Sequence, residues 1–329
     1  MKAWEWRGAP EVVLAERPDE PAAAGEVRLA LLANGFCATD LELVCGRLPD
    51  SRPPLVPGHE IVGRVLESAD PRIEPGARVV VDTMIGCGVC PACRAGHTQV
   101  CPDATEIGLT RDGGWRERMT APAANCHVLP DGVATHLAAL IEPLSCQLGL
   151  VRGARIGADD RVLIVGSGVA ALLYAQLCAA YGAGAVAVAV NDAARGAVAR
   201  SLGADEVIMG SRPAAAGYTK VIDAVGTAES LATAVHAAAP GAHVSLYGLG
   251  ASRPAFPLHE TIFKNLRLSA HTSAPWLWED AIALVASGGV ALDPLVTDRI
   301  AFDDVGAFLT AALDGALGGV HIKAVVEHS

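Results

Sequence analysis

Runs of uncharged residues punctuated by glycine dominate the middle of the chain. The stretch from Val162 to Val190 contains no charged residue. It divides into an apolar strand at 162–165, a Gly-Ser-Gly turn, a helical segment at 169–181, a Gly-Ala-Gly turn and a second apolar strand at 185–190. Such a pattern is typical of a strand-helix-strand unit whose parallel strands are buried on both faces. Because a membrane-spanning helix avoids this punctuation, we expect a buried sheet here.

The same alternation continues toward the C-terminus. Strands are predicted at 206–208, 220–223, 242–247 and 266–269, with a helix at 228–239. Alternating strands and helices predict a doubly wound parallel sheet. After residue 269 the chain is expected to leave this sheet, form a helix at 275–287 and end in a strand at 322–326.

The first 140 or so residues have a different character. They are rich in Gly, Pro and Val and contain short apolar runs such as 26–31, which predict an irregular β domain. A chain of 329 residues exceeds the usual size of one domain. Two domains are therefore expected.

Charge excludes some classes of partner. The net charge is -11 and only 25 of the residues are Lys or Arg, with no basic run. This argues against a nucleic acid or an anionic membrane as partner. The N-terminal residues 1–7 lack the apolar stretch of a secretory signal, so we expect a cytoplasmic protein with reduced thiols.

Four cysteines form the most specific motif in the chain. Two residues separate each of the first three thiols, and a longer step leads to the fourth, at Cys87, Cys90, Cys93 and Cys101. This spacing predicts a tetrahedral thiolate site for structural zinc, which has no open position for chemistry. Disulfides are the alternative, but the odd total of nine cysteines and the expected reducing compartment argue against them.

A glycine-rich turn follows the strand at 162–165. Gly166 permits the turn, Gly168 allows the backbone to approach a pyrophosphate, and Ala171 permits close packing of helix on strand. The choice of nicotinamide cofactor depends on the end of the next strand, where Asn191 precedes Asp192. Asp192 is either a ribose ligand or a helix cap, and Arg195 leaves NADP open. The absence of a basic residue directly after Val190 favours NAD.

Three further segments carry candidate metal ligands. They are Cys37-Ala-Thr-Asp40, Gly58-His59-Glu60 and Glu142-Pro-Leu. Singly, each has a structural explanation: a buried thiol, a core histidine and a solvated helix carboxylate. Together, a thiolate, an imidazole and a carboxylate suit a catalytic zinc with an open fourth position.

With these motifs in hand, the chain resembles the zinc-dependent medium-chain alcohol dehydrogenases, in the polyol and sorbitol dehydrogenase branch, from Met1 to about Glu327. The resemblance implies a GroES-like, irregular β catalytic domain, residues 1–143 and 272–329. A Rossmann coenzyme domain at 144–271 would be inserted into it. It implies two zinc ions per chain and hydride transfer between a nicotinamide cofactor and a small alcohol or ketone. It also implies a homodimer or homotetramer.

The resemblance also assigns roles. Cys37, His59 and Glu142 would ligate catalytic zinc, with Glu60 as an exchangeable or supporting carboxylate. Asp40 would orient His59, as metal-bound imidazoles require, and Thr39 would pass the alcohol proton toward solvent. Gly226 and residues 248–250 resemble loops that flank the nicotinamide. Lys323 is either a pyrophosphate contact or an exposed lysine on the last strand.

The substrate is less well specified. Glu42 replaces a histidine of many relatives, and Leu43 replaces an aromatic residue. Arg111 and Asp112, expected near the substrate mouth, favour a polar alcohol: a polyol, a sugar or an aminocyclitol such as 2-deoxy-scyllo-inosamine. The alternatives are a simple aliphatic alcohol dehydrogenase and a degenerate, non-catalytic zinc- and nucleotide-binding member. A zinc-free reductase of the same superfamily is disfavoured by the cysteine cluster.

Overall fold

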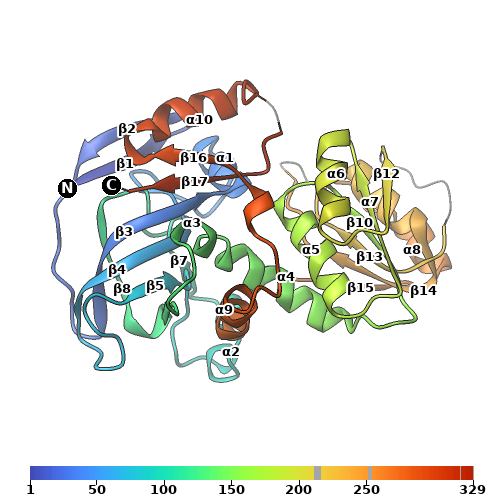
Figure 1. Cartoon of the computed structure of the whole chain (residues 1–329), viewed down its shortest axis with the longest axis horizontal. Coiled ribbons are helices and arrows are strands. Elements are labelled where there is room, and N and C mark those ends of the chain that lie inside the picture. The colour runs from blue at the N-terminus through green and yellow to red at the C-terminus, as the bar shows by residue number, and fades with distance from the viewer. Residues whose placement is uncertain (211–215, 251–253, 319, 329) are drawn as a thin grey trace. The chain divides into compact units, whose positions relative to one another are not determined.

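The computed structural model in Figure 1 describes residues 1–210, 216–250, 254–318 and 320–328. The chain divides into two compact units. The first contains Met1–Pro143, Ala274–Ser287 and Val296–Ser329, and the second contains Leu144–Ser273 and Gly288–Leu295. Residues 288–295 therefore lie in the second unit, whereas the predicted domain boundary placed them with the catalytic domain. The side chain of Gln176 explains this, because its amide donates to the Ala291 carbonyl at 3.0 Å and accepts from the Ala291 N–H at 2.6 Å.

The first unit is built on a mixed sheet. Its strand order is β16-β17-β3-β4-β5-β9, and β8 also pairs with β3. The β1–β2 and β6–β7 pairs form two smaller sheets. Its strands are β1 (Lys2–Gly8), β2 (Glu11–Glu16), β3 (Glu26–Phe36), β4 (Glu60–Ser68), β5 (Arg78–Val81), β6 (Met84–Ile85), β7 (Thr105–Glu106), β8 (Arg118–Pro122), β9 (Cys126–Val128), β16 (Val296–Ala301) and β17 (Lys323–Glu327).

Short helices connect these strands. They are α1 (Ala38–Val44), α2 (Pro91–Arg94), α3 (Thr135–Ala138), α9 (Trp278–Ala286) and α10 (Val305–Leu313), with 3-10 turns at Thr98–Val100, Ala123–Asn125, Pro275–Leu277 and Phe302–Asp304. Helix α4 (Ile141–Ala154) crosses from the first unit to the second.

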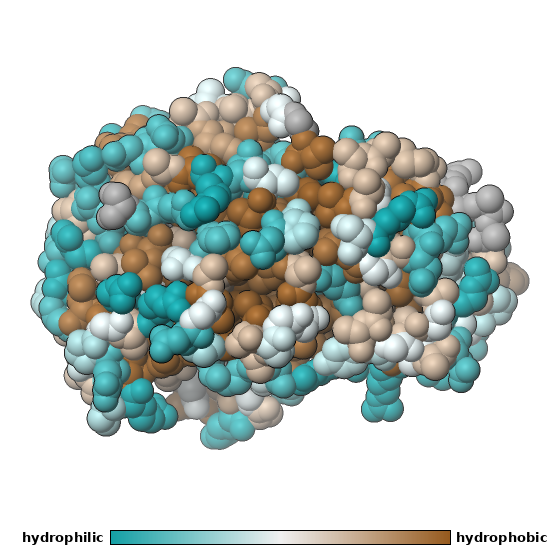
Figure 2. Space-filling model, in the orientation of Figure 1, coloured by the Kyte–Doolittle hydropathy of each residue, from teal (hydrophilic) through white to brown (hydrophobic). Residues whose placement is uncertain are grey.

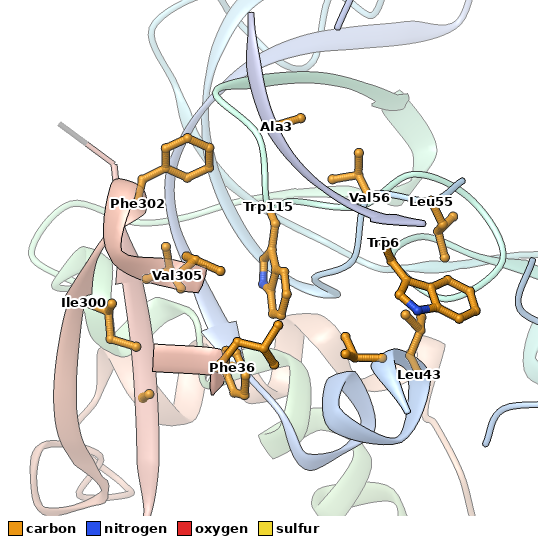
Figure 3. Close-up of a cluster of buried hydrophobic side chains, with 14 residues drawn as sticks. Ala3, Trp6, Phe36, Leu43, Leu55, Val56, Trp115, Ile300, Phe302 and Val305 are labelled. Carbon is orange, nitrogen blue, oxygen red and sulfur yellow. The ribbon is translucent and has the colours of Figure 1, made fainter. Parts of the chain in front are cut away.

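Alternation along β3 explains why the sheet has an apolar side. Val27, Leu29 and Leu31 are buried and belong to one core cluster. Each such side chain stabilises the fold by about 1.5–3 kcal/mol when buried. A second cluster lies at the far end of β3 (Figure 3), where Phe36 stacks on Trp115 with ring centroids 5.1 Å apart. The end of β3 is therefore held rigidly, and this is where the candidate metal ligands begin.

The second unit is a doubly wound parallel sheet with strand order β12-β11-β10-β13-β14-β15. The order reverses between β10 and β13, and ligands of such sheets bind outside the carboxyl ends of the strands at this switch point. Its strands are β10 (Arg161–Val165), β11 (Ala185–Val190), β12 (Glu206–Met209), β13 (Tyr218–Asp223), β14 (Ala238–Leu246) and β15 (Arg267–Ala270). Its helices are α5 (Val169–Ala180), α6 (Ala193–Ser201), α7 (Ala228–Ala237) and α8 (Leu258–Phe263), with a 3-10 turn at Asp293–Leu295.

These elements confirm the predicted fold class, an irregular β domain with a doubly wound parallel-sheet domain. The strand predicted at 185–190 has the same bounds as β11, and the helix predicted at 169–181 ends one residue earlier as α5. Within the described ranges, none of the helices has both the length and the apolar character that crossing a bilayer demands. Hydrophilic residues are spread over the visible surface of both units in Figure 2.

Candidate functional site

The four predicted zinc thiols converge. The sulfur atoms of Cys87, Cys90, Cys93 and Cys101 all lie within 4.8 Å of one another. All nine cysteines of the chain are free, so the predicted alternative of disulfides is wrong. The arrangement is the closed thiolate shell that structural zinc prefers.

Local backbone geometry explains the convergence. Cys90 caps helix α2, and its sulfur accepts the N–H of Cys93 at 3.4 Å. A Cβ atom at Gly86 would lie 2.6 Å from the Cys93 sulfur, so only glycine lets the loop close this tightly. Backbone N–H groups of Val89 and Cys90 lower the pKa of Cys87 to about 7, which favours the thiolate that a metal binds.

A second cluster lies where β3 ends and β4 begins. Antiparallel pairing places Gly35 opposite Glu60, so Cys37, just after β3, lies near His59, just before β4. Ligand atoms of Cys37, His59 and Glu60 lie within 4.8 Å of one another. A Cβ at Gly35 would lie 1.7 Å from Oε2 of Glu60, and the glycine therefore makes room for this carboxylate.

Asp40 organises this cluster. It is fully buried, accepts the backbone N–H of Cys37 at 2.8 Å through Oδ2, and lies 3.2 Å from Nδ1 of His59 through Oδ1. Burial alone would lower the pKa of His59, but the carboxylate of Asp40 and the nearby Cys37 raise it well above its usual value. With a proton held on Nδ1, the other ring nitrogen is available as a metal ligand.

Glu60 and Glu142 differ in how closely they approach the other candidate metal ligands. Glu60 belongs to the set of close ligand atoms, and Glu142, at the start of α4, does not. Burial and the charges of Glu60 and Glu106 nevertheless raise the pKa of Glu142 to about 7, against the lowering effect of His59 and Lys323. Glu142 therefore feels the charges of the cluster, while Glu60 supplies the third close donor.

Lys323 is buried and forms an ion pair with Oε1 of Glu60. The expectation of an exposed lysine is wrong, since only 1% of its side chain is accessible. Its ammonium pairs with Glu60 beside the donor cluster, and a lysine buried in this way is not available to a pyrophosphate. The other oxygen of Glu60, Oε2, is buried and has no hydrogen-bond partner in the described part of the chain.

Sequence reasoning missed Glu106. It lies on β7, which pairs with β6 through Met84, and burial raises its pKa while the charge of His59 opposes this. No spacing motif marks it. The neighbouring glycines carry a weak signal, because a Cβ at Gly108 or Gly113 would approach the Gly58 carbonyl oxygen to 2.4 or 2.2 Å. This segment therefore lies directly against the strand end that carries His59.

Three residues expected near the substrate have other partners. Asp112 pairs with Arg17 at 2.6 Å and accepts the N–H of Val56 at 2.9 Å. Glu42 accepts two hydrogen bonds from Arg47, at 2.6 and 2.7 Å, which lowers its pKa. Leu43 is fully buried in a core cluster. These side chains serve the fold, because their charges and apolar surface are already satisfied there. Arg111 is exposed.

The glycine-rich turn has the geometry its residues predict. Gly166 has φ +124°, Gly168 is the N-cap of α5, and Ala171 is buried. Asp192 caps α6 by accepting the Arg195 N–H at 2.8 Å, which is the structural alternative for this residue. Asn191 is exposed beside it.

Gly226 meets the loop that follows β14. It has φ +79°, and a Cβ there would lie 2.1 Å from the Gly248 carbonyl oxygen and 2.7 Å from the Gly250 nitrogen. The loops named as nicotinamide-flanking therefore pack on one another at the carboxyl edge of the sheet. Any side chain at these positions would separate them.

Comparison with known proteins agrees with this architecture. The family model for the alcohol dehydrogenase GroES-like domain matches residues 23–131, and the zinc-binding dehydrogenase model matches residues 170–287. D-altritol 5-dehydrogenase of Agrobacterium fabrum is 30% identical over 310 residues, covering 91% of this chain and 92% of that protein. L-galactonate-5-dehydrogenase of Escherichia coli is 32% identical over 296 residues, covering 84% and 85%.

A solved structure extends the similarity to the whole fold. A zinc-binding dehydrogenase from Sinorhizobium meliloti 1021, bound to NADP, superposes with a TM-score of 0.90 at 28% identity, covering 99% of this chain and 98% of that one. One family accounts for the cysteine lobe at residues 87–101, for the second donor cluster of Cys37, His59 and Glu60, and for the doubly wound sheet. The chain belongs to the zinc-dependent medium-chain alcohol dehydrogenases, NAD(P)-dependent oxidoreductases of the sorbitol dehydrogenase-like branch.

Proposed function

We propose that this chain interconverts a polar secondary alcohol and its ketone, with a polyol, a sugar acid or an aminocyclitol such as 2-deoxy-scyllo-inosamine as substrate and NAD as cofactor. One observation carries the catalytic part. A thiol, an imidazole and a carboxylate, from Cys37, His59 and Glu60, lie within 4.8 Å of one another and are oriented by a buried aspartate.

The donor set fits zinc. Sulfur, nitrogen and carboxylate oxygen are the ligands of catalytic zinc sites with three protein ligands and an open position. The unpartnered, buried Oε2 of Glu60 supports the assignment, because a buried carboxylate oxygen without a partner is costly. Cys37, His59 and Glu60 would hold the ion. Glu142, which the family resemblance implies as the third ligand, would then be the carboxylate that exchanges with Glu60. The bound ion supplies the Lewis acidity that favours ionisation of the substrate hydroxyl.

Asp40 would orient the metal ligands, and Thr39 would move the substrate proton. Asp40 fixes the ring of His59 and the backbone of Cys37 at once, which keeps both donors in place. The hydroxyl of Thr39 lies 3.5 Å from the Cys37 sulfur. A hydroxyl both accepts and donates, so Thr39 is suited to take up the substrate proton and pass its own toward solvent.

Two carboxylates near His59 support a polar substrate. Glu106 and Glu142 both interact electrostatically with His59, and each remains partly accessible to solvent. Carboxylates accept hydrogen bonds from hydroxyl or ammonium groups. The substrates named for the two relatives, D-altritol and L-galactonate, are polyhydroxylated.

The cofactor proposal rests on the end of β11. Asn191 and Asp192 follow Val190, and the nearest basic residue, Arg195, lies in the first turn of α6. This favours the unphosphorylated ribose of NAD. The similar Sinorhizobium structure contains NADP, so the assay below compares NAD with NADP.

A second zinc and a second copy complete the proposal. The Cys87 to Cys101 cluster would hold a structural zinc, giving two ions per chain. Leu258, Ile262 and Phe263 of α8 are exposed. Exposed apolar side chains gathered on one short helix support a homo-oligomer, because such surfaces are normally covered.

A substrate panel tests the function. Polyols, sugar acids, aminocyclitols and simple aliphatic alcohols are offered to the zinc-loaded enzyme with NAD or NADP, and the absorbance of the reduced nicotinamide is followed. We expect turnover of at least one polyhydroxylated substrate, with a higher kcat/KM when NAD is the cofactor than when NADP is. Turnover of simple aliphatic alcohols alone refutes the polar substrate, and no turnover by the zinc-loaded enzyme favours a non-catalytic member.

A further inference from the structure

The second unit contains a cavity that the dehydrogenase site does not use. Its volume is about 540 Å³, and its lining comes from the end of α4, from residues around the amino ends of β13, β14 and β15, and from Asp160 just before β10. The strands are parallel, so their amino ends lie at the opposite edge of the sheet from the Gly166 turn. Strand β10 alone separates the two edges by about 13 Å.

Basic side chains line up across the floor of this cavity. Lys220 is the register partner of His243, and His243 is the register partner of Arg267. Residues opposite one another on neighbouring strands project from the same face about 4.8 Å apart. Arg155, just after α4, adds another cation to the lining. Basic groups from three strands and one helix end therefore face the same space.

These cations have no acidic partner. Within the described ranges, no carboxylate lies within ion-pairing distance of Arg155, Lys220 or Arg267, and the Lys220 ammonium donates only to the Ala154 carbonyl at 2.8 Å. The one carboxylate of the lining, Asp160, accepts instead from the Gly157 N–H at 3.0 Å and the Thr219 hydroxyl at 2.8 Å.

This local excess of positive charge contrasts with the whole chain, whose net charge is -11. Burial lowers the pKa of His243, and the charges of Lys220 and Arg267 lower it further. The ring donates to or accepts from the Ser269 hydroxyl at 2.7 Å. An imidazole between two cations, with no carboxylate among the described residues acting on it, marks a site of positive potential that an anion would neutralise.

We propose that this cavity is a second ligand site, where Arg155, Lys220 and Arg267 bind the phosphate group of a small phosphorylated metabolite. Arginine forks and a lysine ammonium suit the several oxygens and double charge of a phosphate ester. A volume of about 540 Å³ accommodates a molecule of sugar-phosphate size. The site is independent of the dehydrogenase reaction and of its substrate.

The test uses the zinc-loaded enzyme saturated with NADH, so that coenzyme phosphate sites are filled. Inorganic phosphate, pyrophosphate and glucose 6-phosphate are titrated calorimetrically, with glucose and citrate for comparison. The double variant Arg155→Gln/Arg267→Gln removes two exposed cations of the lining. Arg200→Gln is the matched control, because Arg200 is an exposed arginine of the same unit outside the lining. The His243 ring resonances, assigned with His243→Asn, report where the ligand binds.

We expect the phosphate compounds to bind and to shift the His243 resonances. Their Kd should rise at least about tenfold in the double variant, which is about 1.4 kcal/mol, and stay unchanged in Arg200→Gln. Retained dehydrogenase activity in the double variant shows that it folds. The proposal is overturned if no phosphate compound binds, if binding survives the double variant, or if citrate binds as tightly as the phosphate esters.

Discussion

Lys323 and Glu60 form an ion pair in which each side chain is only 1% exposed. The two residues lie 263 positions apart, on the last strand and at the start of β4. A buried pair of this kind costs desolvation of both charges, which mutual attraction offsets only while both partners remain. Lys323 therefore positions the Glu60 carboxylate beside Cys37 and His59.

Removing the lysine should be more damaging than removing both charges. In the metal-free protein, Lys323→Met leaves a buried carboxylate without a counter-ion, and we expect it to lower the free energy of unfolding by about 3–5 kcal/mol. The double variant Lys323→Met/Glu60→Gln should recover much of this loss. Urea denaturation followed by circular dichroism measures both. Equal losses in the single and double variants would show that the pair is not coupled.

Asp40→Asn should weaken zinc binding without disturbing the fold. The amide oxygen still accepts the Cys37 N–H, but the charge that holds the proton on Nδ1 of His59 is gone. Loss of such an outer carboxylate typically costs 10- to 100-fold in metal affinity. Competition with a chelator measures the zinc Kd. Asp70→Asn, which changes a surface pair with Arg72, is the control and should leave the Kd unchanged.

Cys93→Ser should remove one zinc and destabilise its loop. The Cys93 sulfur belongs to the four-thiol cluster and fits against Gly86. Because the binding energy of a structural zinc is folding energy, we expect a lower Tm and one zinc fewer per chain by elemental analysis. Cys45→Ser, at a half-buried thiol outside both clusters, is the comparison. A Cys93→Ser protein with unchanged zinc content would contradict the assignment.

His328 should make stability fall as the solution is acidified. Its ring stacks on Phe302 with centroids 4.8 Å apart, and burial lowers its pKa to about 4. The unfolded chain, with a pKa near 6.5, takes up a proton first as pH falls. Stability is therefore lost from about pH 6.5 down to pH 4, by about 1.4 kcal/mol at pH 5.5. The difference in unfolding free energy between wild type and His328→Gln should change by this amount between pH 7.5 and 5.5.

The parts of the fold that follow from local pattern were predictable. The uncharged strand at 185–190 and the glycines on either side define β11 without reference to the rest of the chain. The same is true of the cysteine lobe, because its four thiols lie within fifteen residues and a short loop brings them together. Over such short stretches of sequence, hydrophobic periodicity and residue spacing are enough to predict the local structure.

The second donor cluster depends on pairing that the sequence does not reveal by itself. Cys37 and His59 meet because β3 and β4 pair in one register, and the motifs suggested this only through family resemblance. Glu106 reaches the site through the β6–β7 pair, and Lys323 through the last strand. No local signal marks either residue.

Charged residues were the hardest to assign. Asp112 was expected to contact the substrate, but its carboxylate accepts a hydrogen bond from Arg17, which lies 95 positions away. Glu42 similarly pairs with Arg47. Whether a carboxylate serves a ligand or the fold is decided by which cation the tertiary structure brings to it, and sequence spacing does not contain that information.

The most direct test of the proposed chemistry is the rate of nicotinamide reduction by Cys37→Ser, measured beside wild type and Cys45→Ser with the best polyhydroxylated substrate. Metal-ion catalysis contributes several kcal/mol, so we predict a fall in kcat/KM of at least about a thousandfold in Cys37→Ser. The cysteine-lobe zinc should be retained and Cys45→Ser should be fully active. A Cys37→Ser enzyme that keeps wild-type turnover would contradict the account.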